Sequence, residues 1–133
     1  MVGESNLASL ISSMTPELQS PVFVFATLPA DHGVDVPQLN PLFGFREKEG
    51  LTLVVEEAIA KSNGLRFEYP CKQITLTIHS SLSAVGFLAA ITKELAQAGI
   101  SVNAVSAFFH DHLFVSTDRA DDAMAILSRM SQS

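Results

Sequence analysis

Residues 72–116, KQITLTIHSSLSAVGFLAAITKELAQAGISVNAVSAFFHDHLFVS, constrain the fold more than any other stretch. The pattern predicts a strand over 74–78, a serine-rich turn, an amphipathic helix ending at Gly99, a strand over 100–109, a turn at 110–112 and a strand over 113–115. In a split β-α-β unit of this order, the third strand pairs between the first two. The turn after Ile78 and the turn around Asp111 are therefore expected at the same end of one sheet.

A candidate binding site follows from this convergence. The loop from His79 to Ser83 precedes a helix, and the first N–H groups of a helix favour a carboxylate. Asn103, on the second strand, is placed to reach the amino or carboxyl group of such a ligand. The same serines are also typical helix caps, and Asn103 also suits simple pairing within a sheet. Both interpretations stay open at this point.

The three histidines expected at this end, His79, His110 and His112, allow a second interpretation. Neutral imidazole is a common zinc or nickel ligand, and a His-x-His pair across a turn can converge on one ion. The spacing matches no established metal signature, and polar turns commonly carry His and Asp for hydrogen bonding. We therefore predict a structural or ligand-binding role for the histidines and keep a metal site as the alternative.

Composition restricts the classes of function. The 133 residues include 14 acidic and 8 basic side chains, a net charge of −6 that disfavours nucleic acid as a partner. A single cysteine, Cys71, excludes an intrachain disulfide and a cysteine-only zinc site, and we expect it to be buried. No apolar run reaches the length of a membrane span, and the first residues lack the basic start of a signal peptide. We expect a cytoplasmic protein without membrane contact.

The first half of the chain repeats part of this plan. Residues 5–14 predict a short helix, 22–26 a strand covered on both faces, 29–41 a long loop, 42–55 a hairpin, 56–64 a helix and 66–69 an edge strand that Pro70 ends. Thr15-Pro16 is typical of a helix start or of a turn. Asp118 is expected to cap a last helix. Because a hairpin followed by an acid-started helix occurs twice, we predict two related halves, 1–70 and 71–133, with the first half beginning on a helix.

The segment Gly86-Phe87-Leu88-Ala89-Ala90-Ile91, with Leu95-Ala96-Gln97-Ala98-Gly99-Ile100 after it, resembles the helix of an ACT domain. The phrases FREKEGLTLVVE and FFHDHLFV are similar to those of a small bacterial group of stand-alone tandem ACT proteins. The resemblance implies an α+β fold of two ferredoxin-like (βαββαβ) halves, with antiparallel sheets covered by helices. It also implies dimerisation and the sensing of a small ligand.

The leading hypothesis is a non-catalytic regulatory module that binds an amino acid and acts on a separate partner, as a homodimer and without a cofactor. The expected ligand-binding residues are His79, Ser80, Ser81, Leu82, Val85, Gly86, Asn103, His110 and His112. One alternative is an interaction domain that binds no ligand. Another is a metal-binding protein that uses His79, His110 and His112, including a metal-dependent enzyme. The sequence contains no G-x-S-x-G, P-loop or H-E-x-x-H motif, which disfavours catalysis.

Overall fold

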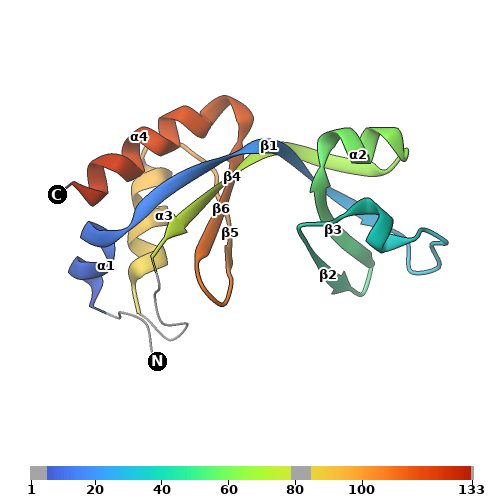
Figure 1. Ribbon diagram of the computed structural model, residues 1–133, viewed down its shortest axis with the longest axis horizontal. Helices are drawn as coiled ribbons and strands as arrows, with labels where there is room; N and C mark the ends of the chain where they lie inside the picture. Colours follow the sequence, from blue (N-terminus) through green and yellow to red (C-terminus); the bar gives the residue numbers. More distant parts are fainter. Residues whose placement is uncertain (1–5, 79–84, 133) are drawn as a thin grey trace. The chain divides into compact units, whose positions relative to one another are not determined.

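The computed structural model describes residues 6–78 and 85–132 (Figure 1). The elements in chain order are α1 (Leu7–Ser13), β1 (Thr15–Leu28), the 3-10 helix η1 (Val36–Leu39), β2 (Phe43–Glu47), β3 (Gly50–Glu56), α2 (Glu57–Ser62), β4 (Arg66–Thr77), α3 (Phe87–Gln97), β5 (Asn103–Ser106), β6 (Asp111–Ser116), the 3-10 helix η2 (Thr117–Arg119) and α4 (Ala120–Ser131). Within these residues, no helix has the length and apolar character needed to cross a lipid bilayer.

The chain forms two compact units. The central unit is Pro21–Cys71, and the terminal unit combines the segment that ends at Ser20 with the segment that begins at Lys72. The strands are hydrogen-bonded in the order β2-β3-β1-β4-β6-β5. Strands β1 and β4 each run through both units, so each unit has four strands. The predicted domains, 1–70 and 71–133, divide the chain differently from these compact units and remain a sequence-based proposal.

The strand order confirms the predicted arrangement of the terminal unit, because β6 lies between β4 and β5. Helices α1, α3 and α4 cover one face of its strands (Figure 1). The buried side chains of this core include Leu10 of α1, Ile74 and Leu76 of β4, Ile91 and Leu95 of α3, Leu113 and Val115 of β6, and Leu127 of α4. The helical and alternating patterns of the sequence therefore bury their apolar faces against each other.

The central unit has the equivalent order β2-β3-β1-β4 but less helical cover. Its core comprises Val24, Ala26 and Leu28 of β1, Leu53 and Val55 of β3, Ala60 of α2, and Leu39 of η1. The loop predicted over 29–41 contributes η1, so it covers part of the sheet where the other unit has a helix. The strand predicted over 22–26 is not covered equally on both faces, since Phe25 is only half-buried.

Strands β1 and β4 are both longer than two local sequence signals predicted. Thr15-Pro16 lies at the start of β1 instead of a helix, and β4 continues through Pro70 instead of ending there. Long-range contacts fix the early part of β1, because the Gln19 side-chain amide donates to the Thr75 hydroxyl at 3.3 Å and the Thr77 hydroxyl donates to Glu17. Tyr69 adopts a positive φ of 67°, which bends β4 next to Pro70 without ending it.

The turns and caps of the second half also differ slightly from expectation. The turn between β5 and β6 is closed by the Ala107 N–H donating to the His110 carbonyl at 3.0 Å, and β6 already begins at Asp111. The predicted turn at 110–112 is therefore placed too late. Asp118 lies in η2 and accepts a hydrogen bond from the Ser116 hydroxyl, so it does not cap α4 itself.

Candidate functional site

The predicted ligand-binding residues fall partly outside the described chain. His79, Ser80, Ser81 and Leu82 lie outside the described residues. Val85 is 85% exposed, directly before α3, and Asn103 is an exposed residue at the start of β5. The described part of the predicted site therefore consists of the start of α3, the start of β5 and the histidine pair.

Among the described residues, no side chain caps the start of helix α3. Its N-cap is Gly86, which has a left-handed φ of 91° and no side chain that could accept from the first turn. The first helical hydrogen bond runs from the Ala90 N–H to the Gly86 carbonyl at 2.9 Å. The N–H groups of the first turn and the helix dipole make this end attractive to an anion.

His110 connects the β5–β6 turn to the end of β4. Its Nδ1 donates to the Ile78 carbonyl oxygen at 3.1 Å, so in the neutral ring Nε2 is left as an acceptor. This contact confirms that the end of β4 at Ile78 and the turn before Asp111 lie at the same end of the sheet. A single hydrogen bond therefore fixes both the position and the tautomer of this imidazole.

His112 has the opposite tautomer. Its Nδ1 lies 3.0 Å from the Gln73 side-chain nitrogen, which donates, so the proton is on Nε2. The Thr75 hydroxyl also contacts Nδ1, at 3.1 Å, and both Gln73 and Thr75 are buried. Burial is the main cause that lowers the pKa of His112, and the charge of His110 lowers it further, against the raising effect of Asp111. His112 is therefore neutral at pH 7.

The two rings form a complementary pair. Their centroids are 6.5 Å apart, with a T-shaped orientation. His110 offers an acceptor and His112 offers a donor, which suits a ligand with both an N–H and a carboxylate group. Asp111 is buried and accepts a hydrogen bond from the Ser106 hydroxyl. Among the described residues, no group of three or more His, Cys, Asp or Glu side chains is placed to hold a metal ion.

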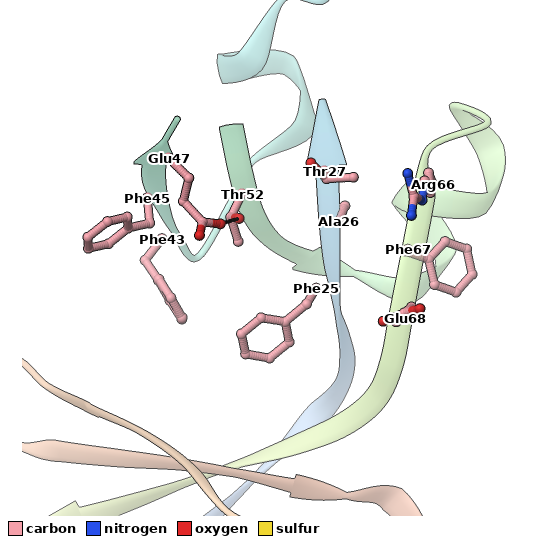
Figure 2. A pocket seen from close by; sticks show the side chains of 10 residues that line it. All are labelled: Phe25, Ala26, Thr27, Phe43, Phe45, Glu47, Thr52, Arg66, Phe67 and Glu68. Atoms are coloured by element: carbon pink, nitrogen blue, oxygen red, sulfur yellow. Dashed lines mark hydrogen bonds between the residues drawn. The ribbon is translucent and has the colours of Figure 1, made fainter. Parts of the chain in front are cut away.

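A second concave site, which the sequence did not reveal, lies in the central unit. This aromatic cleft has a volume of about 420 Å³ (Figure 2). It is lined by phenyl rings, hydroxyls and charged side chains: Phe25, Ala26, Thr27, Phe43, Phe45, Glu47, Thr52, Arg66, Phe67 and Glu68. In the sequence these phenylalanines alternate with polar or small residues, and the same pattern is typical of a buried strand face, so no local signal marks them as a site.

The register of the strands explains why the rings gather. Phe25 and Phe43 are both paired with Val54, a fully buried residue on the strand between them, and Phe45 is paired with Thr52. Phe25 and Phe43 meet in a T-shaped contact with centroids 6.3 Å apart. Between Phe43 and Phe45, a Cβ at Gly44 would lie 2.9 Å from Leu53 Cδ2, so glycine allows the close approach of β2 to β3.

Comparisons with known proteins agree on the family. Two family models described as ACT domain match residues 2–72 and residues 68–129. No curated protein matches the chain. A solved structure of VC0802 from Vibrio cholerae, described as a protein of unknown function and possible transport protein, has 41% sequence identity and a TM-score of 0.86, and the match covers 95% of this chain and 96% of that one.

More distant solved structures share the fold. A putative C-terminal regulatory domain of aspartate kinase from Porphyromonas gingivalis W83 has a TM-score of 0.61 at 11% identity, covering 92% of this chain and 99% of that one. The regulatory subunit of aspartate kinase from Thermus flavus has a TM-score of 0.57 at 8% identity, covering 88% and 95%. With its two matches along the sequence and its ferredoxin-like α+β halves, the chain belongs to the ACT-domain family.

Proposed function

We propose that this protein is a non-catalytic regulatory module that binds an amino acid at the histidine end of the terminal unit. The site comprises Val85 and Gly86 at the start of α3, Asn103 on β5, the pair His110 and His112, and the residues His79, Ser80, Ser81 and Leu82. The observation that carries the proposal is the 3.1 Å hydrogen bond from His110 to Ile78, because it joins the histidine pair to the end of β4, from which the chain leads to α3.

The chemistry of the described groups supports an α-amino acid. The start of α3 favours the ligand carboxylate, because Gly86 supplies no side chain to the N–H groups of the first turn. The His110 Nε2 lone pair can accept from the ligand ammonium group, and the His112 Nε2–H is a further donor on the face of the sheet opposite the helices. Each role uses the ring nitrogen opposite the one that is hydrogen-bonded within the protein.

Family membership supports a regulatory role. ACT domains are regulatory modules that often bind amino acids, and the distant structural relatives include regulatory parts of aspartate kinase. We propose that this chain acts in the cytoplasm as a homodimer on a separate partner protein, with no catalytic residue, cofactor or membrane contact of its own.

Isothermal titration calorimetry against each common amino acid tests the proposal. We expect one amino acid to bind, and the variants His110→Ala and His112→Gln to weaken its binding at least about tenfold, the loss expected for a hydrogen bond to a charged group. His32→Gln, in the loop of the central unit, is the matched control and should leave the affinity unchanged. Absence of heat with every amino acid, together with unchanged thermal transitions, would refute the proposed ligand class.

A further inference from the structure

We infer that the aromatic cleft of the central unit binds a small organic ammonium ion, at a site separate from the proposed amino-acid site. All residues that line the cleft belong to Pro21–Cys71, whereas the proposed amino-acid site belongs to the terminal unit. The inference therefore stands on different side chains and can fail or succeed independently.

The aromatic rings provide the first argument. Phe25 extends from β1, and Phe43 and Phe45 lie on the β2 side of the cleft, as Figure 2 shows. Phe45 is 67% exposed although it is a large apolar residue, and Tyr69 packs against Phe25 with ring centroids 5.9 Å apart. Aromatic faces that gather around one cavity attract cations through their quadrupoles, and best of all cations whose hydration shell is weak.

The charges of the lining residues provide the second argument. The lining contains two carboxylates, Glu47 and Glu68, and one guanidinium, Arg66, so it carries a net charge of −1. The carboxylate of Glu47 is held in place by the Thr52 hydroxyl. Within residues 6–78 and 85–132, the side chain of Glu68 has neither a hydrogen bond nor an ion pair, so its carboxylate is available to a cation.

The arrangement of the strands places Glu68 on the side of the cleft opposite Phe43 and Phe45, whereas Glu47 shares β2 with these two rings. In the order β2-β3-β1-β4, the rings of Phe43 and Phe45 come from one outer strand and Glu68 from the other, with Phe25, Thr27 and Thr52 on the strands between them (Figure 2). A ligand in the cleft would therefore contact rings on one side and a carboxylate on the other. A volume of about 420 Å³ is that of a small-molecule site.

The cleft thus fits a monovalent cation that carries methyl or other apolar groups. An anion would meet both carboxylates, and a neutral apolar molecule would leave Glu68 without a partner. Arg66 lies two residues from Glu68 on β4, about 6.6 Å along the strand, so its charge opposes a bound cation only moderately. Removal of the Arg66 charge should therefore raise the affinity for the cation. This direction of change distinguishes a cation from an anion as the ligand.

A comparison of two isosteric probes tests the role of charge. Choline and 3,3-dimethyl-1-butanol have the same shape, but only choline carries a positive charge. We expect choline to bind the intact protein about twofold to fivefold more tightly in calorimetry or NMR titration at low salt, the ratio that an exposed cation–π contact produces. Equal affinity for the two probes, or no binding of either, would overturn the inference.

Four variants locate the site. Phe43→Leu and Glu68→Gln should each weaken choline binding severalfold, and Arg66→Gln should strengthen it, whereas His110→Ala in the terminal unit should leave it unchanged. Glu68 and Arg66 are exposed, so these two variants test the inference even if Phe43→Leu fails to fold. Weaker binding in Arg66→Gln would contradict the predicted sign. Loss of choline binding in His110→Ala would show that the cation binds at the proposed amino-acid site instead.

Discussion

The two units share one strand order but differ in what covers and what lines their sheets. The terminal unit has α3 between β4 and β5, and its sheet carries Gln73, Thr75 and His112 on the face opposite the helices. The central unit has the loop with η1 in the position of α3, and its corresponding face carries phenylalanines. The first arrangement offers a helix start to a carboxylate. The second has no such helix and offers aromatic rings to a cation. In the two proposals made above, one backbone plan thus serves two different ligand chemistries.

The largest predicted effect concerns Cys71, the last residue of the central unit. Its thiol is fully buried, donates to the Phe23 carbonyl at 3.3 Å, and has a pKa that burial raises to about 12. Because thiolate forms only on opening, labelling with a disulfide reagent at pH 8 should be on the order of a thousandfold slower than in urea-unfolded protein. Labelling as fast as in the unfolded chain would mean that the central unit opens readily by itself.

Core truncations compare the two units directly. Leu127→Ala in the terminal unit and Leu53→Ala in the central unit should each lower the free energy of unfolding by about 2–5 kcal/mol, because both side chains are buried. Val85→Ala, at an 85% exposed position, should change it by less than about 0.5 kcal/mol. Since β1 and β4 run through both units, we expect a single urea transition in every variant. Two separate transitions would show that the units unfold independently.

Much of the fold could be predicted because its signals are local and periodic. The alternation at Ile74 and Leu76 and the helical spacing of Ile91 and Leu95 determine which faces are buried, and the hydrogen bond of His110 to Ile78 confirms the predicted convergence. The extent of β1 could not be predicted, because a side-chain hydrogen bond from Gln19 to Thr75 outweighs the local helix signal at Thr15-Pro16. Propensity is a weak prior where tertiary pairing is available.

The aromatic cleft illustrates a different limit of sequence analysis. Phe43 and Phe45 alternate with Gly44 and Arg46 in the way that core residues do. Whether that face is covered depends on other elements of the fold, and in the central unit the helical cover lies on the opposite face, with Ala60 and Leu39. The histidine pair was easier to anticipate, since a His-x-His motif beside a predicted turn can be read directly from the sequence.

A pair of glycine substitutions tests the tighter turn of the central unit. A Cβ at Gly50, where φ is 156°, would lie 2.5 Å from the Leu28 carbonyl oxygen, whereas at Gly99, with a φ of 75°, no atom lies within 4 Å. Gly99→Ala should cost about 1 kcal/mol through backbone strain alone. Gly50→Ala should cost at least about 1 kcal/mol more, because a backbone atom must also move. Equal losses in urea unfolding would contradict the predicted clash.

The smallest predicted effect is a pH dependence that belongs to the terminal unit. The pKa of His112 is lowered in the folded protein, mainly by burial, so the unfolded chain takes up the proton first as the pH falls. The neutral His112 ring makes its full contribution to stability above pH 6.5, the ordinary pKa that it has in the unfolded chain. This contribution is lost as the pH falls toward the lowered pKa of the folded protein. The urea midpoint should decline from pH 7 to pH 5, and less steeply in His112→Gln. His32→Gln provides the control, and an equal slope in His112→Gln would argue against this assignment.

The long strands β1 and β4 have a consequence for errors in folding. In a strand, a shift of pairing by one residue turns every side chain to the other face. In β1 such a slip would expose Val24 and Ala26 in the central unit and would also break the contact of Gln19 with Thr75 in the terminal unit. In β4 it would expose Ile74 and Leu76 while moving Glu68 away from the aromatic cleft. A folding intermediate with a slipped β1 or β4 thus loses native contacts in both units at once. Correct pairing in one unit therefore favours the correct register in the other.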